Sequence, residues 1–178
     1  MQLGLIVCTD SKGGIARDGD IPWHNREDMR HFQKTTIGKS NNAVIMGRTT
    51  WESLKFKPLK HRVNIVVSSV MQEEDADRLC WVVRTPEAAV ELAHELNVDE
   101  AWVIGGRQIY KALEHHPELS IIYRTILIDS YLCDVFYFTN MVEFQEDGDP
   151  QAIHKGYIHK YVRVPVEQTT PGLRQQEC

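Results

Sequence analysis

The chain has 178 residues and a net charge of −5, and 42% of its residues are apolar and 25% charged. This length and balance fit one soluble domain with a buried core, and they exclude a disordered chain. The apolar runs are too short to span a membrane, and the acidic balance argues against general nucleic-acid binding. Because no charged-then-apolar leader precedes the first apolar run, we expect a cytoplasmic protein.

Short apolar runs alternate with helical patterns over the first two thirds of the chain. The pattern predicts strands over residues 3–9, 43–46, 63–68, 80–83 and 101–104. Helices are expected after the cap residue Asn25, after Gly47, after the cap Thr85 and over residues 107–113. In the third helix the expected inner stripe consists of Ala89, Leu92, Ala93 and Leu96.

The remaining segments complete the predicted architecture. Residues 10–24 form an unusually long, glycine-containing connection, which is typical of a lid. Strand-like runs over 120–129, 135–139 and 157–166 follow one another without a helix, which favours antiparallel additions to the sheet. The acidic run 73–77 is an expected solvated turn, and residues 168–178 are an expected mobile tail. We therefore predict one domain over 1–178, with a three-layer α/β/α fold and a mostly parallel mixed sheet that ends in antiparallel strands.

The cysteines and histidines do not predict a metal site. Four scattered cysteines (Cys8, Cys80, Cys133 and Cys178) form no C-x-x-C pair, and the eight histidines lack the spacing of metal ligands. Neither a metal centre nor a disulfide framework is expected.

Two strand-to-helix junctions share one design, in which glycine follows a strand and a helix begins at once. They are VIMGRTTWESL over residues 44–54 and WVIGGRQIY over 102–110. Free N–H groups at a helix start favour anions, and an arginine at each junction adds a cation. The chain has neither a G-x-G-x-x-G motif nor a P-loop lysine, so a phosphate or dinucleotide binder of another lineage is predicted.

Asp28 admits two interpretations. An acid in the first turn of a helix is ordinarily a surface residue favoured by the helix dipole. Here, however, Phe32 lies one turn further on and Met29 is expected on the same inner side, where a carboxylate is costly without a polar partner. A ligand donor is therefore a candidate partner for Asp28. Trp23 is either a staple between loop and core or part of a site, and a buried Tyr110 would need a partner for its hydroxyl.

These stretches together resemble the dihydrofolate reductase family, over roughly residues 3–165. In chain order they are LIVC, GDIPW, the acid at Asp28, AVIMGRTTWES, FKPLKHRVNIVVSS, WVIGGRQIY, Thr125 and DVFYF. The resemblance implies that family's fold, with about eight strands in the sheet. It also implies a monomer that binds a small substrate, dihydrofolate, and antifolate inhibitors, with no need for membrane or nucleic acid.

The resemblance assigns roles on the substrate side. Asp28 would hydrogen-bond the pterin, Thr125 would orient Asp28, and Trp23 would hold a water and close the lid. Phe32 would stack beside the aminobenzoyl group, and Arg62 would pair with the glutamate carboxylate. The catalytic set is Asp28, Trp23, Tyr110 and Thr125, and the remaining substrate-binding residues are Ile6, Val7, Cys8, Met29, Gln33, Leu54, Leu59 and Ile104.

The resemblance also implies NADPH as cofactor. Arginines such as Arg48 and Arg84 suit its 2′-phosphate, and the family joins Gly105 to Gly106 by a cis peptide. The full expected set is Cys8, Ile15, Gly19, Asp20, Gly47, Arg48, Thr49, Thr50, Ser68, Ser69, Arg84, Gly105, Gly106, Arg107, Gln108, Ile109 and Tyr110.

The implied reaction is hydride transfer to C6 of dihydrofolate with water-assisted protonation at N5, gated by residues 10–24. Two alternatives stay open, a riboflavin-pathway pyrimidine reductase of the same fold and a non-catalytic copy that binds folate or RNA. The chain departs from the family pattern at Ala16, Arg26, Arg107-Gln108 and Val135.

Overall fold

The structure is a computed structural model that describes residues 1–72 and 80–164. The expected acidic turn over 73–77 and the expected mobile tail over 168–178 lie outside the described residues. Within the described residues, no helix has the length and apolar character needed to cross a membrane.

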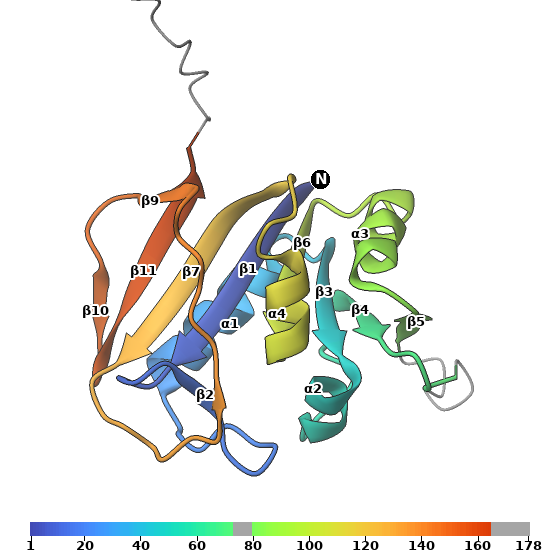
Figure 1. Ribbon diagram of the computed structural model, residues 1–178. Coiled ribbons are helices and arrows are strands. Elements are labelled where there is room, and N and C mark those ends of the chain that lie inside the picture. Colours follow the sequence, from blue (N-terminus) through green and yellow to red (C-terminus); the bar gives the residue numbers. More distant parts are fainter. Residues whose placement is uncertain (73–79, 165–178) are drawn as a thin grey trace, which may run out of the picture.

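The main sheet is mixed and has nine strands, with parallel pairing at its centre (Figure 1). Strand β1 (Gln2–Thr9) pairs in parallel with β6 (Glu100–Gly105) on one side and β7 (Leu119–Leu127) on the other. Beyond β6 come three more parallel strands, β3 (Asn42–Gly47), β4 (Arg62–Val67) and β5 (Trp81–Val83). Beyond β7 the pairing is antiparallel, through β11 (Gly156–Arg163) to β10 (Gln151–Ile153) and β9 (Phe144–Glu146). The predicted parallel sheet with an antiparallel end is confirmed.

Helices cover both faces of this sheet, so the predicted three-layer fold is also confirmed. Side chains alternate along β1, where Leu3, Leu5 and Val7 join one core cluster and Ile6 joins the other. Helices α3 (Pro86–Glu95) and α4 (Arg107–Leu113) pack on the first cluster. Helices α1 (Arg26–Ile37) and α2 (Arg48–Ser53) pack on the second, and Figure 1 shows α1 behind the sheet and α4 in front of it.

Local sequence signals place the helix starts correctly. The Asn25 side chain accepts hydrogen bonds from the N–H groups of Glu27 and Asp28, both at 3.1 Å. The Thr85 hydroxyl accepts one from Ala88 at 3.1 Å, directly before Pro86. On α3 the expected inner stripe packs on the core, with two fully buried alanines and two partly buried leucines, and Val90 joins it.

Residues 10–24 and 135–139 differ from expectation. Part of the supposed long connection is a strand, β2 (Gly14–Ala16), which pairs with the two-residue strand β8 (Val135–Phe136) in a separate sheet. The predicted strand over 135–139 is therefore shorter and does not join the main sheet. A strand pattern alone does not identify the strand with which it pairs, and here β2 pairs with a strand about 120 residues away in the chain.

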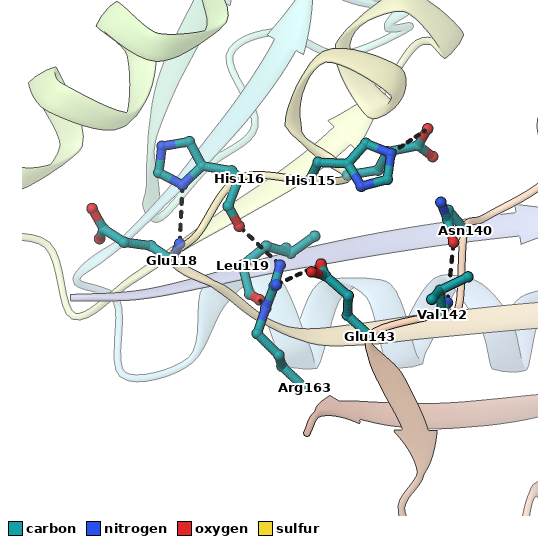
Figure 2. A network of polar contacts seen from close by, with 9 residues as sticks. His115, His116, Glu118, Leu119, Asn140, Val142, Glu143 and Arg163 are labelled. Atoms are coloured by element: carbon teal, nitrogen blue, oxygen red, sulfur yellow. Dashed lines mark hydrogen bonds and ion pairs between the residues drawn. The ribbon is translucent and has the colours of Figure 1, made fainter. Parts of the chain in front are cut away.

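Arg163, at the end of β11, fastens the antiparallel end of the sheet to the turn between α4 and β7 (Figure 2). Its guanidinium donates to the carbonyl oxygens of Leu119 at 2.6 Å and His116 at 2.9 Å. It also donates to the Glu143 carboxylate at 2.6 Å and lies over the Phe144 ring at 5.0 Å. One side chain thus satisfies two main-chain carbonyls and one acid.

We expect Arg163→Met to lower the free energy of unfolding by about 2–3 kcal/mol, because the Leu119 and His116 carbonyls lose a charged donor. Glu143→Gln, which removes only the half-exposed ion-pair partner, should cost less than about 1 kcal/mol. Urea unfolding of the two variants measures this difference. Equal losses would show that the ion pair, and not the carbonyl contacts, stabilises this end of the sheet.

Candidate active site

The two glycine junctions lie side by side at the carboxyl ends of neighbouring strands. In the pairing of β3 with β6, Met46 is in register with Gly105. A Cβ atom built on Gly106 would lie 3.3 Å from the Thr50 hydroxyl, and one built on Gly47 would lie 3.9 Å from the Gly106 nitrogen. The Gly105–Gly106 peptide bond is cis, as the resemblance implied. The junctions therefore form one surface where main chain, rather than side chains, is available to a ligand.

The helix starts at these junctions are not capped by side chains. Gly47 and Gly106 are the N-cap residues of α2 and α4, and neither helix start has a side-chain cap hydrogen bond. The first-turn N–H groups can therefore donate to an anionic ligand. Around them Thr49, Arg107 and Gln108 are exposed, Thr50 is half-buried and Ile109 is buried.

The two arginines expected at the cofactor phosphate are both engaged with protein atoms. Arg48 pairs with Glu52 at 2.9 Å, and both side chains are about half exposed. Arg84 donates to the carbonyls of Ser68 at 2.9 Å and Met71 at 2.8 Å, so it also braces the turn after β4. The sequence motifs did not predict that Arg84 also stabilises this turn, because main-chain acceptors have no sequence signature.

The other residues expected near the cofactor lie at three places, after β4, on β2 and in the turn that follows β2. Ser68 is buried and its hydroxyl accepts the N–H of Met71 at 2.9 Å, whereas Ser69 is exposed. Ile15, on β2, packs against the core cluster of α3 and α4. Gly19 and Asp20 lie in an exposed turn, where a bridge pairs Arg17 with Asp20.

Asp28 lies on α1 and faces the carboxyl ends of β1 and β7, where Cys8 and Thr125 are in register. Burial raises the pKa of the Asp28 carboxyl, while hydrogen bonds from Thr125 and Cys8 and the nearby His31 act in the opposite direction. The expected contact between Thr125 and Asp28 is confirmed, and Thr125 is only 1% exposed. The carboxylate is therefore an inward-facing group, not a surface acid.

Cys8 and Trp23 complete the surroundings of this carboxyl. Burial, followed by the proximity of Asp28, raises the pKa of the Cys8 thiol far above its usual value, so the thiol stays protonated and can donate. The Trp23 side chain forms a hydrogen bond with the same thiol. Its ring also packs against Tyr131, with centroids 5.3 Å apart and planes at 56°. Trp23 thus contacts the site and a second loop, and in the described residues it belongs to neither core cluster.

His31, which lies one turn after Asp28 on the same face of α1, was not among the residues predicted for the site. Its ring meets the Tyr123 ring edge-on at 4.7 Å, and its buried Nε2 atom has no hydrogen-bond partner in the described residues. Burial lowers the pKa of His31, which favours the neutral ring. His31 also acts electrostatically on the Asp28 carboxyl, and its i, i+3 spacing from Asp28 is the sequence signal that could have identified it.

A row of apolar side chains lies beside Asp28 on the same face of the sheet. Ile6 is buried there, and the partly buried members of this row, packed against the core cluster of α1 and α2, are Phe32, Leu54, Leu59 and Ile104. Two expected members do not join it as predicted. The Val7 side chain packs in the opposite core cluster because strand side chains alternate, and Met29 is 43% exposed. Gln33 is also exposed.

Arg62 lies at one end of this apolar row. Its guanidinium is 5.8 Å from the Phe32 ring centroid and donates to the Thr36 hydroxyl at 2.7 Å and the Lys60 carbonyl at 3.0 Å. Desolvation lowers the pKa of this guanidinium without removing its charge at neutral pH. A fixed cation beside an aromatic wall suits a ligand with an apolar body and a terminal anion.

Tyr110 connects the two halves of the site. Its hydroxyl donates to the Ile6 carbonyl on β1 at 2.9 Å, so the expected need for a partner is confirmed. Burial raises the pKa of this phenol, which keeps it neutral. The ring lies 3.3 Å from the position of a Cβ on Gly105 and stacks on Tyr137 at 4.8 Å. Tyr110 therefore holds β1 and the second glycine junction at a fixed separation.

The sequence model of the dihydrofolate reductase family matches residues 2–161. The chain belongs to that family. It is 38% identical to a Schistosoma mansoni protein named dihydrofolate reductase, over 77% of this chain and 78% of that protein. Two others with that name are 33% identical, from Heliothis virescens, and 30% identical, from Ureaplasma parvum. These alignments cover 92% and 90% of this chain and 96% of each relative.

The departures from the family pattern lie at three places in the fold. Ala16 and Val135 are in register with each other in the pairing of β2 with β8, so these two departures share one contact. Arg26 and Arg107 are the exposed first residues of α1 and α4. None of the four contacts the Asp28 carboxyl through a described interaction. Within the described residues no group of His, Cys, Asp and Glu side chains could hold a metal ion.

Asp28→Asn should stabilise the protein increasingly as pH rises. The pKa of the unfolded carboxyl lies near its ordinary value of 3.8, while the folded carboxyl, whose pKa is raised, keeps its proton to higher pH. The folded state therefore binds more protons in that window, and wild-type stability falls there by about 1.4 kcal/mol per unit of pKa difference. The amide does not ionise and escapes this loss.

Urea unfolding of both proteins at pH 4 and pH 7 tests this expectation. The exposed Asp149→Asn provides a matched control, because it makes the same chemical change at the protein surface. A difference between Asp28→Asn and wild type that stays constant with pH would contradict the raised pKa.

Proposed function

We propose that this chain catalyses the NADPH-dependent reduction of 7,8-dihydrofolate to tetrahydrofolate. The observation that carries the proposal is the inward-facing Asp28 carboxyl, held by Cys8 and Thr125 at one end of an apolar row. A single acceptor in such surroundings suits a flat ligand that presents adjacent N–H groups, as the pterin of dihydrofolate does. Membership of the dihydrofolate reductase family supports the same substrate.

The row of apolar side chains suits the rest of that substrate. Phe32 provides a flat wall for the aminobenzoyl group, with Leu54, Leu59 and Ile104 beside it. Arg62, packed against Phe32, would pair with the glutamate carboxylate, because its planar guanidinium matches a carboxylate in a bidentate contact. The pterin of the ligand then lies at the Asp28 end of the row, and its glutamate carboxylate lies at the Arg62 end.

The paired glycine junctions fit a dinucleotide cofactor. Side chains at Gly47 and Gly106 would fill the space between the two helix starts, whereas glycine leaves main-chain N–H groups for phosphate oxygens. Thr49, Thr50 and Arg48 would hold phosphates at the first junction, with Ser68, Ser69 and Arg84 beside it. Bound there, NADPH supplies the hydride that C6 of the substrate accepts.

The residues around Asp28 would control the proton. Asp28 anchors the pterin and raises the basicity of N5, and a water held by Trp23 delivers the proton to N5. Cys8 and Thr125 keep the carboxyl in place by hydrogen bonding. Residues 10–24 would close over the ligands and limit the access of other water.

Dihydrofolate-dependent oxidation of NADPH, followed by absorbance, tests the reaction directly. Asp28→Asn should lower kcat/KM about 100-fold, because it removes the charge from two hydrogen bonds to the pterin. It should weaken inhibition by a diaminopyrimidine for the same reason. Asp149→Asn should keep wild-type activity, and an inert wild type would overturn the proposal.

Preference for NADPH over NADH tests the predicted cation at the 2′-phosphate. Arg48→Gln should lower the ratio of kcat/KM with NADPH to that with NADH about 10-fold, the effect of one lost charged contact. The matched control is Lys39→Gln, an exposed cation between α1 and the amino end of β3, whereas Arg48 follows the carboxyl end of that strand. Equal use of both cofactors by the wild type would remove the assigned role of Arg48 and Arg84.

A further inference from the structure

Asp10, the residue after β1, carries a carboxylate that the proposed reaction does not use. It is only 2% exposed, and a carboxylate at that depth is costly unless hydrogen bonds replace its water. Its Oδ1 atom accepts the N–H groups of Lys12 at 2.9 Å and Gly14 at 2.7 Å. Its Oδ2 atom accepts the N–H of Tyr131 at 3.0 Å and the hydroxyl of Ser130 at 3.5 Å.

These contacts join two segments that are far apart in the sequence. One is the start of the predicted lid, residues 10–14, and the other is the stretch 129–131 after β7. The main chain supports the same junction, since Ser11 donates to the Asp129 carbonyl at 3.0 Å. The backbone hydrogen bonds to Asp10 outweigh its desolvation and hold its pKa below the usual value, so the carboxylate is ionised at neutral pH.

Tyr131 connects these two segments to the residues around Asp28. The residue whose N–H binds Asp10 places its ring against Trp23, and Trp23 hydrogen-bonds the Cys8 thiol beside Asp28. Three successive contacts therefore lead from the Asp10 carboxylate to the thiol. Trp23 therefore contacts both Tyr131 and Cys8.

We propose that Asp10 is a positioning residue that fixes Tyr131 and thereby holds Trp23 against Cys8, beside the Asp28 carboxyl. Its effect on turnover rests on the proposed function, whereas its effect on the position of Trp23 does not. In this proposal the effect of Asp10 on Trp23 runs through Tyr131 and not through a contact with the substrate.

Quenching of Trp23 fluorescence by acrylamide tests the position of the ring directly. The chain has four tryptophans, so the Trp23 signal is obtained by subtracting the signal of a matched Trp23→Phe protein in each background. Asp10→Asn and Tyr131→Leu should each make Trp23 more accessible to the quencher. Tyr131→Phe keeps the ring, and Asp129→Asn changes a half-exposed acid of the same segment that pairs with Lys155, so both should quench as wild type does.

A double-mutant cycle separates positioning from general loosening. If Asp10 acts through Tyr131, then Asp10→Asn adds no further quenching in the Tyr131→Leu background. Quenching that is unchanged in Asp10→Asn, or that adds in the double variant, overturns the proposal. Tyr131→Leu leaves the Asp10 carboxylate intact, so it tests the link from Tyr131 to Trp23 even where Asp10→Asn does not fold.

Activity provides a second readout. Asp10→Asn and Tyr131→Leu should each lower kcat about 10-fold while the KM for NADPH changes little, because Trp23 lies on the substrate side. Equal loss through the KM for NADPH would overturn the proposed direction of action. A wild type that shows no turnover refutes the proposed function, and the quenching result still decides the positioning role.

Discussion

The proposed substrate side of this protein depends on one buried carboxyl group, that of Asp28, and on the cost of removing it from water. Taking a carboxylate out of water costs free energy, and Cys8 and Thr125 offset part of that cost with hydrogen bonds. Both donors come from strand positions that are in register at the centre of the sheet. The carboxyl is therefore held by two paired strands at the centre of the sheet, which suits the proposed binding of a ligand in one orientation.

Strand β1 supplies contacts to almost every part of the site. Its side chains alternate, so Ile6 and Cys8 face α1 while Val7 packs on the opposite core cluster. Its main chain accepts the Tyr110 hydroxyl at the Ile6 carbonyl, which links it to the second glycine junction. The residue that follows it, Asp10, binds the N–H of Tyr131, whose ring packs on Trp23. Distortion of this strand would disturb the substrate side and the glycine junctions together.

Much of the fold follows from local patterns. Apolar runs and cap residues predict the parallel strands and the starts of α1 and α3, because period, capping and proline position act over a few residues. The two glycine junctions and the acid at Asp28 are also readable, since their residue types are unusual for their positions. Contacts between segments that are distant in the sequence cannot be predicted in this way. The pairing of β2 with β8, the contact of His31 with Tyr123, and the use of Arg84 to brace a turn each join segments with no shared pattern.

The amino-acid sequence by itself determined the family, the alternation of strands and helices, and which residue types could carry the chemistry. Those properties reside in motifs whose meaning does not depend on distant residues. Only the tertiary structure decided that Val7 faces away from the site, that Met29 is exposed, and that Asp10 reaches Tyr131. The physical reason is that burial and hydrogen bonding are properties of contacts between segments, and those contacts exist only when the sheet has assembled.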